Sequence, residues 1–343
     1  MNTVAIWLTA VQRACSARSS MKPFLTWLAG TAMLLAATLS VQAQQYPERS
    51  INIIVPFSAG GVTDVIGRTV GEKMSKQMGQ PVLVENKPGA GGNIGAAFVA
   101  GSKPDGYTLL MLIDAGTIAP ALYPKLNYDP IKSFAPITML ATGAHLVVAH
   151  PSFGPSNLQQ LVSAAKANPN TIFFASSGTG TSQHLGMEQL KTATGMQIQH
   201  VPYKGGGEAI NALVAGQVPV GMIGIAPALP HIRAGTLKAL AITSARRSAL
   251  LPDVPTVSES GVPGFESFNW FALVAPAGTP SAITERIHAE AVRAMRGPGM
   301  ADRLAALGVE VRLSDKPAEL TRFIREDIVK WPPIVKASNI KVE

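Results

Sequence analysis

The chain contains a single cysteine among 343 residues, Cys15, and it lies in an N-terminal segment that we predict to be removed. The mature protein would then have no disulfide bond, no thiolate metal site and no reactive thiol. Charged residues are also scarce, at 15%, and no lysine or arginine run interleaved with aromatic residues occurs. These absences exclude a disulfide-stabilised scaffold, a cysteine-ligated metal protein and a nucleic-acid-binding protein.

Catalytic and cofactor motifs are missing as well. The segment GAGGNIG (89–95) lacks the third glycine of a dinucleotide fingerprint, because Ile94 occupies that position. No Walker A lysine, G-x-S-x-G elbow or H-E-x-x-H pair occurs, and the six histidines are scattered. The sequence therefore predicts no cofactor, no metal site and no catalytic residue, which favours a binding protein over an enzyme.

The first 43 residues have the organisation of a secretory signal peptide. Lys22 follows a second methionine, Phe24–Leu39 is apolar and uncharged, and Val41-Gln42-Ala43 is a small-x-small cleavage site. The apolar run is short for a membrane span. We therefore predict cleavage after Ala43, export to the periplasm, and a formal net charge that falls from +8 to +5 as three basic residues are removed. An uncleaved membrane anchor is the alternative.

Behind this segment, apolar strands alternate with glycine loops and amphipathic helices. INIIVPF (51–57) predicts a buried strand with a helix following from about Asp64 to Met78, and the rhythm returns at TIFFAS (171–176) and VPVGMIG (218–224). Such alternation predicts an α/β fold with parallel sheets and right-handed crossovers. The length suggests two domains, and the proline- and glycine-rich stretch after Ser244 indicates a long crossing connection.

The pattern also predicts several local boundaries. APITML (135–140) and HLVVAH (145–150) predict two separate strands. Thr279 is predicted to cap a helix that has Pro280 at its first position and ends near Met295. A last helix is predicted from about Pro317 to Trp331, followed by a tail.

Four apolar strands end in a small-residue turn that leads into a helix: VPFSAGGVTD, LIDAGTIAP, FASSGTGTSQH and PYKGGGEA. In open parallel sheets, ligands bind beyond the carboxyl ends of strands, where helix N-termini present free N–H groups and a positive dipole end. One such turn is ordinary in an α/β protein, whereas four in one chain predict a carboxylate or phosphate site. His184, in the first turn of the third helix, is the histidine best placed to contact an anion.

Longer segments resemble a known family. YPERSINIIVPFSAGGVTDVIGR, GQPVLVENKPGAGGNIGAAFVA, HVPYKGGGEAINALVAGQV, LPDVPTVSESGVPGFE and APAGTP are similar to the Bug family, the periplasmic substrate-binding components of tripartite tricarboxylate transporters. The resemblance covers Tyr46 to Glu343. It implies a two-lobed type II periplasmic-binding-protein fold, with mixed, mainly parallel sheets, two crossover strands and a ligand cleft between the lobes. Lobe 1 is expected at 44–141 plus 269–343, and lobe 2 at 142–268.

The resemblance also implies that a ligand carboxylate is held by backbone amides and bridging waters from turns of both lobes. The ligand-binding residues implied in this way are Phe57, Ser58, Ala59, Gly60, Asp64, Ala115, Gly116 and Thr117 in the first lobe, and Ser177, Gly178, Thr179, Gly180, Ser182, His184, Tyr203 and Gly205 in the second. Three have structural alternatives: Asp64 as an early-helix acid favoured by the dipole, Ser182 as a helix cap, and Tyr203 as wall packing. The implied partners are a small organic carboxylate and the membrane permease, and we expect a monomer.

One departure from the family pattern bears on the ligand. Many relatives carry an aspartate after the strand that here reads VPVGMIG, where it meets a ligand ammonium, whereas this chain has Met222-Ile223-Gly224. An apolar patch cannot offset a desolvated ammonium, so we expect a carboxylate without an amine, such as a dicarboxylate or an aromatic acid. Two other functions stay open: an exported hydrolase that uses Ser177 or Ser182 with His184, and a ligand-loaded sensor partner in signalling.

Overall fold

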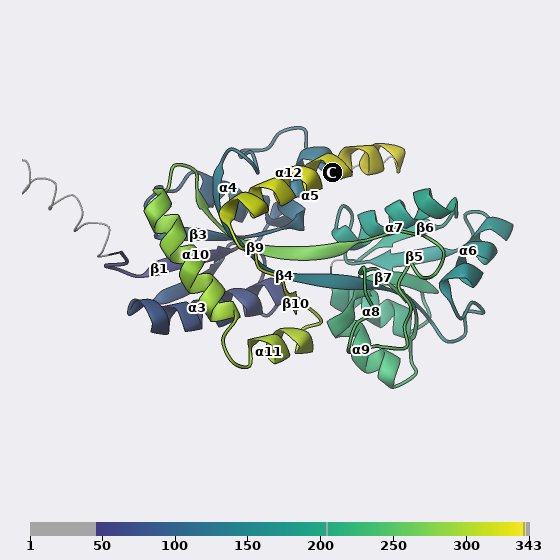
Figure 1. The fold of residues 1–343 in the computed structure, drawn as a ribbon. Helices are drawn as coiled ribbons and strands as arrows, with labels where there is room; N and C mark the ends of the chain where they lie inside the picture. The colour runs from purple at the N-terminus through teal and green to yellow at the C-terminus, as the bar shows by residue number, and fades with distance from the viewer. Residues whose placement is uncertain (1–45, 204, 339, 341–343) are drawn as a thin grey trace, which may run out of the picture. The chain divides into compact units, whose positions relative to one another are not determined.

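The computed structural model describes residues 46–203, 205–338 and 340. The predicted signal peptide and its cleavage site at Ala43 lie outside these residues. The chain separates into a unit of residues 1–48 and a unit of residues 49–343, and the second unit contains every described helix and strand (Figure 1). Within the described ranges, no helix combines the length and the apolar content that a membrane crossing requires.

The first group of strands lies at one end of the sheet. It comprises β1 (Ile51–Val55), β2 (Val82–Asn86), β3 (Thr108–Ile113), β9 (Phe268–Pro276) and the short β10 (Glu310–Val311). β1 runs parallel to β2 and β3, and β9 runs antiparallel to β3. The helical segments of this part of the chain are α3 (Val62–Met78), η2 (Ala90–Gly92), α4 (Asn93–Ala100), α5 (Asp114–Leu122), α10 (Ser281–Met295), α11 (Met300–Ala306) and α12 (Pro317–Ala337).

The second group of strands lies at the other end. It comprises β5 (Phe173–Ser176), β6 (Gln199–Pro202), β7 (Val220–Gly224) and β8 (Lys238–Ile242), with helices α6 (Leu158–Ala167), α7 (Ser182–Thr194), α8 (Gly206–Val214) and α9 (Ile225–Arg233). β5 is parallel to β6 and β7. The α/β class predicted from the strand and helix rhythm is therefore confirmed, and the sheet is mixed, as the family resemblance implied, rather than purely parallel. The lobe boundaries stay a prediction.

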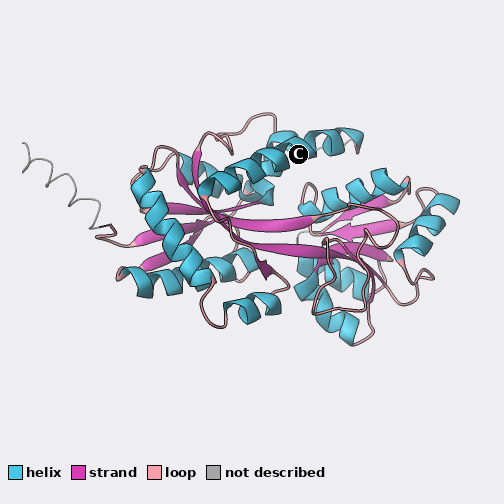
Figure 2. Cartoon of the chain, in the orientation of Figure 1, coloured by secondary structure: helices cyan, strands magenta, loops and turns pink. Residues whose placement is uncertain are grey.

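β4 (Phe134–Ala149) joins the two groups in one sheet of order β2-β1-β3-β9-β4-β7-β5-β6. Its residues up to Ala144 pair with β9, and from His145 onward they pair with β7 and β8. Figure 2 shows β4 and β9 as the long strands running between the groups. The prediction of two separate strands here was wrong, because the ATGA segment between them keeps its ladder to β9 instead of turning.

Apolar packing forms a core on each group and a small cluster that connects three helices. Ile54, Leu110 and Trp270 belong to the core of the first group, and Phe174 and Met222 to a core of the second. The connecting cluster contains Ile118 of α5, Leu185 of α7, and Trp331 and Val335 of α12. Each such buried side chain contributes about 1.5–3 kcal/mol of transfer free energy, so this cluster favours placing the N-terminal ends of α5 and α7 near each other.

Two helix boundaries differ from the prediction. The N-cap of α10 is Pro280, and the hydroxyl of Thr279 donates back to the Pro276 carbonyl at 2.7 Å instead of capping the helix. α12 continues beyond Trp331 to Ala337 through two internal prolines. The burial of Trp331 and Val335 against α5 and α7 explains the extension, because tertiary packing offsets the hydrogen bonds that proline removes.

Asp327 fixes α12 to the rest of the molecule. Its Oδ2 accepts hydrogen bonds from Trp270 Nε1 of β9 at 3.1 Å and from Thr117 Oγ1 of α5 at 2.5 Å. The carboxyl is 9% exposed and Thr117 is fully buried. A buried carboxylate needs such donors, because an unpaired one carries a large desolvation cost.

We expect Thr117→Val to lower the free energy of unfolding by about 1–3 kcal/mol, because it leaves a buried carboxylate with one donor fewer. Urea denaturation measures the loss. Thr321→Val on α12 is the matched control, since its half-buried hydroxyl only bonds back to Pro317. Equal effects of the two substitutions would contradict the anchoring role of Asp327.

Candidate functional site

A pocket of about 210 Å³ opens where segments of both strand groups meet. Its volume is below the range of about 300–1,000 Å³ that is typical of pockets for drug-sized ligands, so it suits a ligand smaller than these. The lining is part apolar and part neutral and polar, and it comprises Phe57, Gly91, Asn93, Ile113, Asp114, Ala115, Ile118, Ala119, Leu122, Tyr123, Ser177, Thr179, Gly180, Thr181, Ser182, Gln183 and Asn269.

Three helices begin at this pocket. Asn93, Asp114 and Ser182 are the first residues of α4, α5 and α7, and all three line it. The first N–H groups of a helix lack intrahelical partners and carry the positive end of the dipole, so three such ends favour an anionic group. Among the described residues that line the pocket, Asp114 is the one with an acidic side chain, and none has a basic one. For an anion in this pocket, the attraction would come from backbone dipoles and neutral polar groups rather than from lysine or arginine.

The structure divides the predicted site residues into two sets. Six of them line the pocket: Phe57, Ala115, Ser177, Thr179, Gly180 and Ser182. The other ten lie outside its lining: Ser58, Ala59, Gly60, Asp64, Gly116, Thr117, Gly178, His184, Tyr203 and Gly205. Several of these ten have well-defined structural contacts.

Asp64 orders the loop before α3. Its carboxylate accepts from the Gly60 N–H at 2.9 Å and from Asn86 Nδ2 at 2.8 Å, and it pairs with Arg68 at 3.0 Å. Burial alone would raise the pKa of Asp64, but the hydrogen bonds from Arg68, Gly60 and Asn86 outweigh it and lower the pKa. Since Asn86 Nδ2 also donates to the Phe57 carbonyl, this carboxylate positions the loop and already binds the Gly60 N–H that was predicted to face a ligand.

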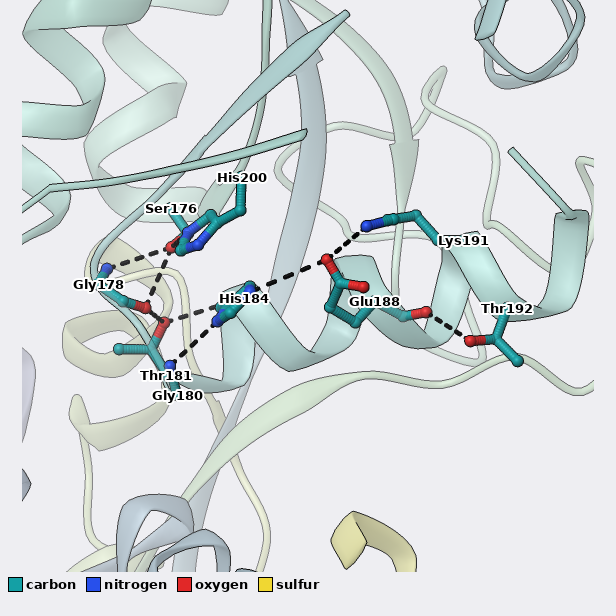
Figure 3. A network of polar contacts seen from close by, with 9 residues as sticks. All are labelled: Ser176, Gly178, Gly180, Thr181, His184, Glu188, Lys191, Thr192 and His200. Atoms are coloured by element: carbon teal, nitrogen blue, oxygen red, sulfur yellow. Dashed lines mark hydrogen bonds and ion pairs between the residues drawn. The ribbon is translucent and has the colours of Figure 1, made fainter. Parts of the chain in front are cut away.

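The ring of His184 contacts the 177–181 loop that precedes α7 (Figure 3). Its Nδ1 accepts from the Gly180 N–H at 3.1 Å, its ring stacks on His200 with centroids 3.6 Å apart, and its Nε2 lies 3.8 Å from Glu188 Oε1. Burial, followed by the nearby His200 and Lys191, lowers the pKa of His184 to about 3. The ring is therefore neutral, with its proton on Nε2, and it positions Gly180.

Hydroxyl groups complete this loop. Ser176 Oγ lies 2.7 Å from His200 Nε2 and donates to the Gly178 carbonyl at 3.1 Å. Thr181 Oγ1 donates to the same carbonyl at 2.8 Å and accepts from the His184 N–H at 3.3 Å, as Figure 3 shows. The N-cap of α7 is thus Thr181, and the alternative of Ser182 as a cap was wrong.

The contacts of the serines do not form the nucleophile–histidine pair that the hydrolase alternative requires. Ser177 Oγ donates to Gln183 Oε1 at 2.9 Å, and the hydroxyl of Ser182 contacts the carboxyl of Asp114. The two ring nitrogens of His184 face the Gly180 N–H and Glu188. Ser176 Oγ does contact a histidine, His200, but Ser176 is fully buried behind the loop. The geometry therefore gives the hydrolase no support.

The remaining predicted residues lie outside the lining for different reasons, and Ser58 and Ala59 are exposed in the loop before α3. Thr117 bonds Asp327, and a Cβ on Gly116 would lie 2.6 Å from Leu112 Cδ1, so both belong to the underside of α5. Tyr203 packs beside an apolar cluster of the second strand group, and its N–H donates to the Ser176 carbonyl at 3.2 Å. Gly205 is the N-cap of α8.

Sequence reasoning missed several lining residues, above all Asp114. The turn LIDAGTIAP was recognised, but its acid was passed over in favour of the small residues that follow. The loop GAGGNIG, examined only as a nucleotide motif, supplies Gly91 and Asn93. The glycines themselves are the sequence signal, because a left-handed backbone favours glycine. Gly91 and Gly92 have φ of 64° and 97°, and a Cβ on Gly92 would lie 3.2 Å from Phe57.

Asp114 is the acidic residue of the described pocket lining, and its pKa is strongly raised. It is 4% exposed, and burial raises its pKa to about 7. The hydroxyl of Ser182 and the Ala115 N–H partly oppose the shift in pKa, whereas the charge of Asp327 reinforces it. The contact between Asp114 and Ser182 links the first turn of α5 to the first turn of α7.

Comparisons with known proteins agree with this architecture. Residues 66–340 match the model of the "Tripartite tricarboxylate transporter family receptor". The structure of the periplasmic binding protein BugD is similar, with 35% identity and a TM-score of 0.75, covering 87% of this chain and all of BugD.

Two similar structures have a carboxylate ligand bound. MatC from Rhodopseudomonas palustris, with bound malate, has 35% identity and a TM-score of 0.74 over 84% of this chain and 100% of its own. Rpa4515 of R. palustris, with adipate, has 30% identity and a TM-score of 0.77 over 87% of this chain and 99% of its own. The family match and these full-length similarities show that the chain belongs to the tripartite tricarboxylate transporter family receptors and has their two-lobed periplasmic-binding-protein fold.

Proposed function

We propose that this protein is a periplasmic solute-binding protein that captures a small organic carboxylate in the pocket and delivers it to the permease of a tripartite tricarboxylate transporter. One observation carries the proposal: the N-termini of α4, α5 and α7 meet at a pocket of about 210 Å³. Their N–H groups favour a carboxylate, and the carboxylates bound by MatC and Rpa4515 support the same ligand class.

The pocket also favours a ligand with an apolar body. Phe57, Ile113, Ile118 and Leu122 provide an apolar wall. Hydroxyl and amide side chains, such as those of Thr179 and Asn269, are available for a second polar end. A dicarboxylate with an aliphatic chain, or an aromatic acid, fits this division. As in the sequence-based expectation, the ligand carries no amine, and the protein acts as a monomer without catalytic turnover.

A thermal-shift screen with malate, adipate, citrate, benzoate and glutamate tests the ligand class. We expect simple carboxylates to raise Tm and glutamate to have little effect, because ligand binding to the folded state stabilises it by mass action. Native mass spectrometry of protein purified from its own periplasm identifies a retained ligand. Stabilisation by glutamate alone would contradict the absence of an amine, and no response to any acid would contradict the carboxylate proposal.

Gly180 provides a test of the pocket itself. Its φ is +75°, and a Cβ would lie 2.4 Å from Leu122 Cδ1, so Gly180→Ala must displace one of two residues that line the pocket. We expect Gly180→Ala to weaken carboxylate binding about tenfold or more, equivalent to about 1.4 kcal/mol. Isothermal titration calorimetry measures the change in Kd.

Gly235→Ala is the matched control for this substitution. Gly235 has a similar φ of +72°, is exposed, and has nothing within 4 Å of a Cβ. Gly235→Ala therefore imposes the same backbone strain without contacting the pocket. If both variants bound carboxylate like the wild type, the assignment of this pocket as the ligand site would be wrong.

Transport and sensing are separated by a deletion strain. A transport role predicts loss of carboxylate uptake, whereas a sensor role predicts an altered transcriptional response with uptake intact.

A panel of esters tests the hydrolase alternative, for which we expect no turnover, because the serines and His184 are committed to other contacts.

A further inference from the structure

Asp114 is an unusual residue for a pocket that holds an anion. It is the first residue of α5, is nearly fully buried, and lines the pocket together with Ser182 of α7. Its carboxyl contacts the hydroxyl of Ser182 and the N–H of Ala115. A carboxylate ligand that enters the pocket therefore meets an acidic side chain and, among the described lining residues, no basic one.

The charged groups near Asp114 come from α12. The charge of Asp327 adds to burial in raising the pKa of Asp114, and burial lowers the pKa of Lys330 against the opposing charges of Asp327, Glu266 and Asp114. Lys330 lies outside the pocket lining, and its Nζ is 3.5 Å from the Glu266 carbonyl. From α4 and β9 the pocket presents the neutral Asn93 and Asn269, and from the end of α5 the hydroxyl of Tyr123. Asp327 and Lys330 of α12 are thus the charged groups that act on Asp114, and Lys330 does not line the pocket.

Two carboxylates that share one desolvated site do not both stay ionised. Their repulsion is strongest where water is excluded, whereas a carboxylic acid donates a short, charge-assisted hydrogen bond to a carboxylate. A single proton between the two groups turns repulsion into attraction. The buried setting of Asp114 already favours its neutral form before the ligand arrives.

We propose that Asp114 binds the ligand's carboxylate as a neutral carboxylic acid, so that ligand capture takes up one proton wherever the free protein holds Asp114 ionised, and that this selects carboxylates over ammonium-bearing solutes. This inference rests on the proposed function and adds the residue that distinguishes ligands by their charge. An ammonium would instead favour the ionised form of Asp114 and release a proton on binding. The direction of proton movement thus reports which chemistry the pocket accepts.

The dependence of Kd on pH follows from the position of Asp114. Ordinary carboxylic acids ionise at about pH 4, so above about pH 6.5 the ligand keeps one charge state. Burial raises the pKa of Asp114 to about 7, so above this pH the free protein loses the proton that binding requires. Carboxylate affinity should then fall about tenfold for each pH unit, and it should be constant well below pH 7.

The test is calorimetric titration of the full mature protein with adipate and malate from about pH 6.5 to about pH 9, in two buffers of different ionisation enthalpy. We expect proton uptake to approach one per ligand near the upper limit, together with the fall in affinity. Asp114→Asn should bind without proton uptake and with a Kd that no longer depends on pH, because an amide donates at every pH. Asp253→Asn, at an exposed acid, is the control and should match the wild type.

The outcomes separate this inference from the proposed function. Carboxylate binding by the wild type without proton uptake and without pH dependence overturns the role of Asp114 and leaves the proposed function standing. Proton release on binding of glutamate, with no binding of adipate or malate, overturns both. Because the proton count is measured on the wild type, the test does not require the variant to fold.

Thermal unfolding of Asp114→Asn provides an independent readout. The pKa of Asp114 is raised on folding, so the wild type loses stability as pH increases from about 4 towards 7. The amide avoids this loss. We therefore expect the variant to have a higher Tm than the wild type at about pH 8, with the difference shrinking as the pH falls towards 4. A Tm difference that does not change with pH would contradict a buried, titrating carboxyl at this position.

Discussion

The pairing of β4 with both strand groups is the constraint on which the site depends. One strand pairs with β9 along its first part and with β7 and β8 along its last, so both strand groups belong to one sheet. That continuity brings the carboxyl end of β3 and the carboxyl end of β5 to a common pocket. The helices that follow these strands, α5 and α7, then present their N-termini to the same small volume.

The loops around the pocket are held by contacts that a ligand need not supply. Asp64 fixes the first loop through Gly60 and Asn86, and His184 fixes the second through Gly180. Both side chains are buried, and each binds a backbone N–H. Such pre-organisation reduces the entropy that ligand binding must overcome, which matters in a pocket whose described lining contains no basic side chain.

Much of this arrangement was readable in the sequence, and the errors have physical causes. The strand–turn–helix rhythm predicted the α/β class, and three of the four small-residue turns contribute residues to the pocket lining, whereas the described residues of PYKGGGEA do not. The turns also suggested that every small residue in them faces the ligand. Asp64 and His184 show why that fails, because a polar side chain one helical turn away can bind the N–H first. Asp114 was overlooked because its value as a site residue comes from burial, which a turn motif does not report.

The sequence by itself determined the elements, the family resemblance and the positions of the strand-end turns, since these depend on local periodicity and on glycine, proline and small residues. Only the tertiary structure decided which turns share a pocket, that the GAGGNIG loop joins them, and that β4 continues through its glycine. It also decided that an acid lines the pocket while Lys330 stays outside the lining. These features depend on contacts between residues far apart in the chain, and desolvation, which sets the charge of Asp114, exists only once those contacts form.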